Sequence, residues 1–240
     1  MADLILVCAA LFVLLTTAAM VVFPGGAPYD LVARHYLFFD NTFSDLGGLR
    51  TYTGRENDRS RVLFTIALIL VGTSIVGFGP AWRAWASPGR ATRFGTATSA
   101  FALSSGVGFV ATAFLPWDKY LDTHDTVVQV TFGLLAGFIV CLAVVQIANK
   151  APRPWIAANV AYLVGVIGYA AVEFLGPDLT TRRGLRLHVG TQKAIVYASI
   201  LNLAVQAWGV RSRSAPTGGR SLPRPGDRSR RSRDSHLEEI

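Results

Sequence analysis

Side chains that could bind a ligand or transfer protons gather near the ends of long apolar runs in this 240-residue chain. They are carboxylates, imidazoles, amides, a hydroxyl and a lysine, the groups that acid–base catalysis and ligand recognition use. A topology of six membrane spans places all of them on one side of a membrane. The candidates are Ser44, Asp45, Asn57, Asp118, His124, Asp125, Gln129, Glu173, His188, Gln192 and Lys193.

Two kinds of chemistry fit these residue types. Glu173 could act with Asp118 or Asp45 as an acid and base pair. Alternatively, His124 and His188 could hold Zn²⁺ with one carboxylate, because this ligand set leaves a coordination position open for water. That carboxylate would be Asp45, Asp118 or Asp125. A protein without any cofactor is the simpler hypothesis, and zinc is the alternative.

The remaining candidates would contact a ligand directly. Asp125 and Gln129 are four residues apart, so they share a helix face. Lys193 lies within an apolar run, where a charge is costly unless paired, and we expect an ion pair with Glu173. In a purely structural alternative, Asp122 is the N-cap of a helix and Asp125 completes a capping-box-like start. The predicted ligand-binding residues are Ser44, Asn57, Asp125, Gln129, Gln192 and Lys193.

Six apolar runs position these side chains. Each is close to the ~20 residues that a helix needs to cross a hydrocarbon core. Backbone groups in lipid must be paired within their own segment, which an α-helix achieves. The sequence therefore predicts an all-α integral membrane bundle of six helices over residues 1–210. The predicted spans are 4–23, 62–79, 95–115, 127–147, 155–175 and 189–210.

Small residues recur at every fourth position of the third run. They are Thr96, Ala100, Ser104, Gly108 and Thr112. Residues four apart lie on one helix face, and small side chains there allow a neighbouring helix to approach closely. We therefore expect the third helix to lie centrally in the bundle and to pack through this stripe.

Basic residues between the runs indicate the orientation. With six spans both termini face the same side, and charges on the opposite side are balanced. Short loops rich in Arg and Lys stay in the cytoplasm, so we expect a multi-pass inner-membrane protein with both termini inside. The predominance of arginine over lysine is typical of a GC-rich bacterial genome. The two short inner loops contain no acid and five basic residues: Arg83, Arg90, Arg93, Lys150 and Arg153.

The tail over residues 211–240 accounts for much of the formal net charge of +8. It is rich in Arg, Ser, Pro and Gly and almost devoid of large apolar side chains, so we expect disorder. Because it directly follows the last span, anionic lipid headgroups are its expected partners. We expect no nucleic-acid binding, although an arm that folds on RNA or a protein partner is the alternative.

The loop between the first two spans, residues 24–60, is the most unusual segment. Residues 29–43 mix aromatic, aliphatic and charged side chains, as in Tyr36-Leu-Phe-Phe-Asp40. Such a segment can lie in the membrane interface with its apolar face toward the acyl chains. We expect it to form a lid over the outer mouth of the bundle.

Two motifs carry a resemblance to known six-span families. The Asn41-Thr-Phe-Ser-Asp-Leu-Gly47 segment, followed by Asn57, and the Phe114-Leu-Pro-Trp-Asp118 turn, followed by His124, are the residues concerned. They resemble the FGF-receptor-activating protein and damage-regulated autophagy modulator superfamily and a prokaryotic six-span family of unknown function. The resemblance implies a bundle concerned with lipids or membrane organisation and implies no particular reaction.

Three hypotheses follow. The first is a membrane protein that binds a lipid or small amphipathic ligand in a polar pocket at the outer leaflet. The second is an intramembrane hydrolase, transferase or cyclase that acts on a lipid or isoprenoid through carboxylate or histidine–metal chemistry. The third is a transporter, which a polar cluster at one mouth and the lack of inverted repeats disfavour.

Overall fold

The computed structural model describes residues 2–83 and 90–214, which form six α-helices and one short 3₁₀ helix without any strand. All six α-helices are long and apolar enough to cross a membrane, so the fold is that of a multi-pass membrane protein. The elements are α1 (Ala2–Val22), η1 (Ser44–Gly47), α2 (Asp58–Arg83), α3 (Arg90–Ala113), α4 (Trp117–Ala148), α5 (Arg153–Leu175) and α6 (Arg182–Ser214).

Each predicted span corresponds to one helix, but the bounds differ: every helix begins before its apolar run, whereas α1 and α3 end one and two residues before the ends of theirs and α5 ends at the same residue. The largest differences are in α4, which begins at Trp117, and in α6, which runs from Arg182 to Ser214. A helix can continue into the polar zone at the membrane surface, where charged side chains reach water. The N-cap of α4 is Pro116, which makes no side-chain cap hydrogen bond, and the helix is kinked at Tyr120, just before Asp122. Beyond Ser214, the predicted disordered tail lies outside the described residues.

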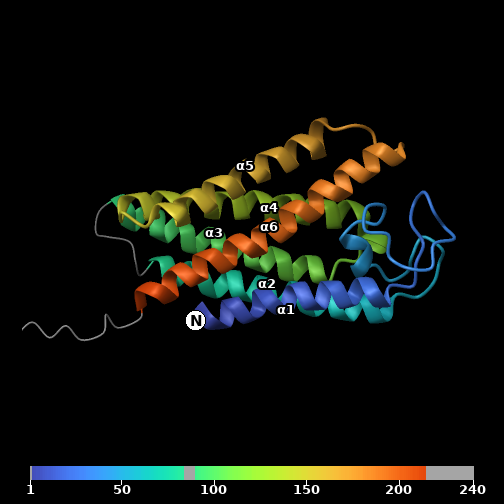
Figure 1. Cartoon of the computed structure of the whole chain (residues 1–240), viewed down its shortest axis with the longest axis horizontal. Coiled ribbons are helices and arrows are strands. Elements are labelled where there is room, and N and C mark those ends of the chain that lie inside the picture. The colour runs from blue at the N-terminus through green and yellow to red at the C-terminus, as the bar shows by residue number, and fades with distance from the viewer. Residues whose placement is uncertain (1, 84–89, 215–240) are drawn as a thin grey trace, which may run out of the picture.

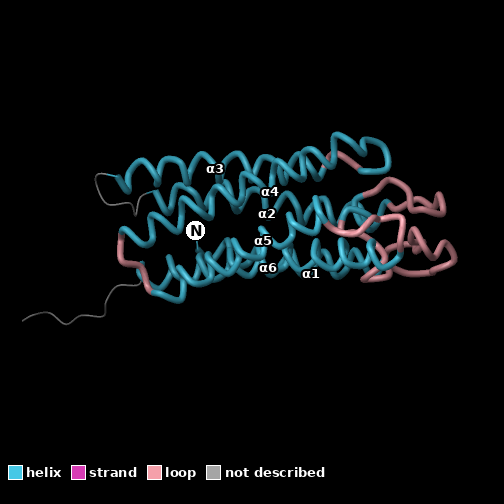
Figure 2. Tube along the Cα trace, turned by 90° about the horizontal axis from the view of Figure 1, so that it is seen from above, coloured by secondary structure: helices cyan, strands magenta, loops and turns pink. Residues whose placement is uncertain are grey.

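The helices form a closed ring. Each packs against its neighbours in the chain, and α6 returns to pack against α1. Figure 1 shows α6 crossing the bundle beside α5, and Figure 2 shows all six helices running along one long axis. A ring of helices encloses an axial interior, and the cavities described below lie there.

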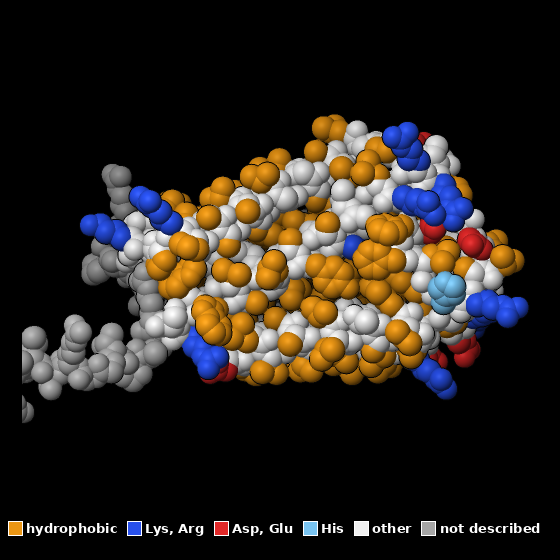
Figure 3. Space-filling model, viewed as in Figure 1, with side chains coloured by type: hydrophobic (Ala, Val, Ile, Leu, Met, Phe, Trp, Pro, Cys, Tyr) orange, Lys and Arg blue, Asp and Glu red, His pale blue; other side chains and the backbone are white. Residues whose placement is uncertain are grey.

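The two ends of the bundle differ. Arg211 and Asp3 form an ion pair of 3.0 Å, so the first and last helices start and finish at the same end, called here the terminal end. The long loop, residues 24–57, gathers at the opposite end, called here the loop end (Figure 1). Hydrophobic side chains cover the middle of the molecule, whereas charged side chains gather at both ends (Figure 3). This distribution suits a bundle surrounded by lipid.

Helices α2 and α3 approach most closely through glycines. A Cβ atom at Gly72 would lie 2.6 Å from the carbonyl oxygen of Gly106. The predicted stripe is therefore only partly correct: Gly108 packs against Thr131, but Thr96, Ala100 and Ser104 are exposed. The face that packs against α2 instead includes Ala102 and Gly106. A period of four residues could not reveal which side of α3 faces its neighbour.

A ring of four amides joins α4, α5 and α6 in the half of the bundle nearer the terminal end. Gln146 donates to Gln206, Gln206 to Asn202, Asn202 to Asn159, and Asn159 back to Gln146, at 2.6–3.2 Å. All four side chains are buried. Each amide donates and accepts within the ring, which removes the cost of burying it without water.

We expect Gly72→Ala to lower the free energy of unfolding by about 1–3 kcal/mol, because the new methyl group would overlap backbone atoms that cannot rotate away. Gly133→Ala is the matched control, since nothing lies within 4 Å of its added Cβ. Thermal unfolding of both purified variants in the same detergent measures the difference. Equal midpoints for Gly72→Ala and the wild type would contradict the close α2–α3 contact.

Candidate functional site

The buried carboxylate of Asp45 organises the long loop at the loop end. It accepts hydrogen bonds of 2.9 Å from the amide of Asn41 and from both the backbone N–H and the hydroxyl of Thr42. The Tyr52 hydroxyl donates a fourth, at 3.3 Å. Burial raises the pKa of the Asp45 carboxyl, while the bonds from Asn41 and Thr42 act in the opposite direction. Burial also raises the pKa of Tyr52 well above its ordinary range, so Tyr52 remains a donor.

Two predicted site residues fasten this loop. Asn57 donates its amide to the carbonyl oxygens of Asp45, Leu46 and Gly48 at 3.0–3.2 Å. Asp118, at the start of α4, accepts from the backbone N–H groups of Leu49 and Arg50, both at 2.9 Å. Neither side chain lines the cavity that contains most other candidates. In this structure, Asn57 and Asp118 hold the backbone that carries the site.

Helix α6 holds the loop through charge. The buried carboxylate of Asp40 accepts two hydrogen bonds from Arg182 and two from Arg186, at 2.8–3.1 Å. Lys193 is also buried; its ammonium donates to the carbonyl of Asn41 and lies 5.0–5.2 Å from the ring centres of Phe38 and Tyr36. Lys193 therefore anchors the loop, and it lines none of the cavities described below.

Most predicted site residues line one cavity of about 250 Å³, called here the polar chamber. It lies between the loop, the first turns of α4, the end of α5 and the start of α6. The chamber brings together the predicted Ser44, Asp45, His124, Asp125, Glu173, His188 and Gln192. Gln129 lies outside it, on an exposed part of α4. The sequence prediction of a polar pocket at one end of the bundle therefore has a physical counterpart.

Ser44 and His124 form the best-defined contact in the polar chamber. The Nδ1 atom of His124 lies 2.6 Å from the carbonyl oxygen of Leu115, and its Nε2 atom lies 2.9 Å from the Ser44 hydroxyl. A carbonyl oxygen can only accept, so Nδ1 carries a hydrogen. In the neutral imidazole, Nε2 is then an acceptor and the Ser44 hydroxyl donates to it. His124 is buried, with 4% of its surface exposed.

Glu173 faces His188 on the opposite wall. Its Oε2 atom lies 3.5 Å from Nδ1 of His188, whose Nε2 atom is 3.1 Å from the carbonyl oxygen of Pro177. The predicted ion pair between Glu173 and Lys193 is therefore wrong. Lys193 follows His188 by five residues and lies on another face of α6, beneath the loop aromatics.

The two predicted metal ligands line the same chamber but have other partners. The Nε2 atom of His124 is engaged by Ser44, and both nitrogens of His188 face oxygen atoms. Within residues 2–83 and 90–214, no group of three or more His, Cys, Asp or Glu side chains could hold a metal ion. The zinc site therefore stays a prediction without an assembled ligand set.

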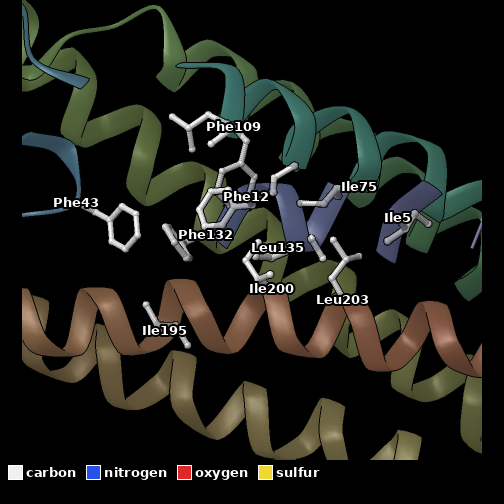
Figure 4. Close-up of a cluster of buried hydrophobic side chains, with 14 of the residues drawn as sticks. Ile5, Phe12, Phe43, Ile75, Phe109, Phe132, Leu135, Ile195, Ile200 and Leu203 are labelled. Carbon is white, nitrogen blue, oxygen red and sulfur yellow. The ribbon is translucent and has the colours of Figure 1, made fainter. Parts of the chain in front are cut away.

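A second cavity of about 50 Å³, called here the apolar chamber, lies deeper in the bundle. It shares Ser44 and Gln192 with the polar chamber. Its other walls are mainly apolar and include Phe12, Phe43 and Phe132. Figure 4 shows the Phe43 ring, carried by the loop, pointing into the bundle toward these rings. The polar chamber at the loop end therefore adjoins the apolar chamber, which lies deeper in the bundle.

Sequence analysis missed several residues that shape the site. Tyr52 and Trp117 line the polar chamber, and their ring centres are 5.1 Å apart. Neither stood out, because an aromatic residue near a membrane surface is common. Arg182 and Arg186 are four residues apart, which suits a shared helix face. That spacing was uninformative while α6 was expected to start at residue 189.

Comparisons of the chain with protein-family models, with curated proteins and with solved structures found no match. The resemblance to six-span families therefore stays a prediction, and function has to be proposed from the geometry of the site.

We expect Asp40→Asn to lower the free energy of unfolding by about 1–3 kcal/mol at pH 7, because two guanidinium groups lose their shared carboxylate. Hydrogen bonds from Arg186 and Arg182 hold the pKa of Asp40 well below its ordinary value. The stabilisation is therefore present above about pH 4 and is lost as the pH falls further.

Unfolding measured from pH 7 to pH 2 should show a constant difference between the variant and the wild type above about pH 4, and a difference that narrows steadily below it. Asp58→Asn is the control, since Asp58 pairs with Arg61 on the exposed surface and such pairs contribute at most ~1 kcal/mol. A constant difference between Asp40→Asn and the wild type across this range would contradict the assignment.

Proposed function

We propose that this protein binds an amphipathic lipid, with the polar head in the polar chamber and the start of an acyl or prenyl chain in the apolar chamber. The observation that carries this proposal is the shared wall formed by Ser44 and Gln192. A ligand that crosses this wall passes from hydrogen-bonding groups to phenylalanine rings within one molecule. Neither a fully polar solute nor a plain hydrocarbon would satisfy both compartments.

The side chains of the polar chamber favour a particular kind of head group. Its walls contain the carboxyl groups of Asp45, Asp125 and Glu173 but no lysine or arginine among the described residues. Carboxylates repel phosphate and accept hydrogen bonds from hydroxyl or amine groups. The proposed ligand therefore presents hydroxyls or an amine to this chamber.

The size of the apolar chamber limits how the chain enters. About 50 Å³ has room for only a short segment of hydrocarbon. A longer chain must displace the surrounding rings. The third cavity, which shares Val71, Ser199 and Ile200 with the apolar chamber, would extend the path toward the terminal end.

We also propose that the terminal end faces the cytoplasm and the loop end the exterior, in the cell membrane. Arg83 and Arg153 lie at helix ends and Lys150 lies in the turn between α4 and α5, all three at the terminal end, as the positive-inside rule requires for this orientation. The polar chamber would then open at the outer leaflet, and its ligand would come from that leaflet.

Filling the apolar chamber tests the proposal. We expect Val128→Trp to reduce the fraction of protein that retains a co-purified lipid at least tenfold, because Val128 lines this chamber. Val130→Trp adds the same bulk two residues away, where the residue is 55% exposed, and should leave lipid retention unchanged. Native mass spectrometry from several detergents measures bound lipid. Lipid-free wild-type protein in all of them, or equal losses in both variants, would overturn the proposal.

A further inference from the structure

We infer that Ser44 and His124 form a nucleophile and base pair that cleaves a carboxylic ester in the bound lipid. This inference rests on the proposed lipid-binding function and adds a reaction to it. A serine hydroxyl is a weak nucleophile until a neighbouring base accepts its proton. The hydrogen bond of 2.9 Å from the Ser44 hydroxyl to Nε2 of His124 has the length and direction that such activation requires.

The orientation of the imidazole supports this role. The carbonyl oxygen of Leu115 holds the hydrogen of His124 on Nδ1, which leaves the lone pair on Nε2 directed at Ser44. In serine hydrolases a carboxylate usually holds the histidine in this tautomer. Here a neutral carbonyl takes that position. It stabilises the imidazolium less than a carboxylate, so a slower reaction than in a full triad is expected.

Two local features of the backbone hold Ser44 and His124 in this geometry. Helix α4 departs from helical geometry at Tyr120 (φ −133°, ψ 47°), between the Leu115 carbonyl and His124. Ser44 is the first residue of η1. Asn57 holds the backbone of η1 through the carbonyl oxygens of Leu46 and Gly48, and Asp118 holds the residues that follow. The nucleophile and the base therefore come from different elements, and Asp118 of α4 fastens the loop of Ser44 to the helix that carries His124.

The position of Ser44 matches the position of an ester in an amphipathic lipid. Ser44 lies at the wall between the two chambers, which is where the head group joins the chain. A carbonyl carbon at this junction would have its acyl chain among the phenylalanine rings and its alcohol part in the polar chamber. A hydroxyl that merely fastened the loop to α4 would have no need to line both cavities.

Gln192 offers a donor for the charge that develops on the carbonyl oxygen. Its Oε1 atom accepts the backbone N–H of Phe43 at 2.9 Å, which fixes the orientation of the amide. The NH₂ group has no acceptor among the described residues, and the side chain lines both chambers beside Ser44. An N–H held in this way can stabilise an oxyanion.

The reaction balances with water as the second reactant. The Ser44 oxygen bonds to the ester carbonyl carbon while its proton moves to Nε2 of His124. The bond to the alcohol oxygen breaks, and the alcohol leaves with that proton. Water then gives a proton to His124 and bonds to the acyl carbon; the bond to Ser44 breaks, Ser44 regains its proton, and a carboxylic acid is released. Nothing is oxidised or reduced.

The test uses the full-length protein in detergent micelles with two probes, a long-chain alkyl fluorophosphonate and para-nitrophenyl dodecanoate. We expect the fluorophosphonate to modify Ser44, located by peptide mass spectrometry, and the ester to be hydrolysed. Ser44→Ala and His124→Asn should each reduce both rates at least about 100-fold, which is within the contribution of general base catalysis. Ser74→Ala is the matched control, because Ser74 is buried in α2 and lines neither chamber.

Lipid retention measured on the same samples separates this inference from the proposed function. If the wild type retains lipid but is not modified at Ser44 and hydrolyses no ester, the inference fails and lipid binding stands. Hydrolysis that persists in Ser44→Ala also overturns it. If Ser44→Ala does not fold, Ser44→Cys replaces it: alkylation of Cys at this position by iodoacetamide should slow at least tenfold when His124→Asn is added, and an unchanged rate would refute the pair.

Discussion

The hydrogen bonds that converge on the buried carboxylate of Asp45 are the interaction on which the loop end depends. A carboxylate without water must find donors within the protein, and Asn41, Thr42 and Tyr52 supply them. Asn41 and Thr42 precede η1 in the chain and Tyr52 follows it. Hydrogen bonding of all three to Asp45 therefore requires the loop to adopt one conformation. Ser44 precedes Asp45 directly, so its position is a consequence of the same network.

Polar groups at the other end of the bundle obey the same constraint in a different way. The four amides from Gln146 to Gln206 pair with one another in a closed ring and leave the axis between the two polar clusters apolar. The cavities between these clusters are lined mainly by apolar side chains, so a molecule inside the bundle meets its most polar surroundings at the loop end and at the amide ring. This arrangement is why an amphipathic ligand suits the structure better than a solute that must remain hydrated along its path.

The sequence was a good guide to the helices and a partial guide to the site. Six apolar runs could form only helices in lipid, so their number and approximate centres were predictable. The clustering of Ser44, His124, Glu173 and His188 around one chamber followed from their common depth. Their common depth did not predict which side chains pair. Glu173 contacts His188 and not Lys193, because helix rotation and loop packing decide which neighbour a side chain meets.

By itself, the sequence determined that this protein has six helices long and apolar enough to span a membrane, with its candidate site residues at one end, since length and apolarity depend on each segment alone. Only the tertiary structure decided that Asp118 and Asn57 hold the loop, that Arg182 and Arg186 share Asp40, and that Ser44 donates to His124. The physical reason is that a hydrogen bond needs two atoms within about 3 Å. Residues 80 positions apart reach that distance only through the packing of the whole chain.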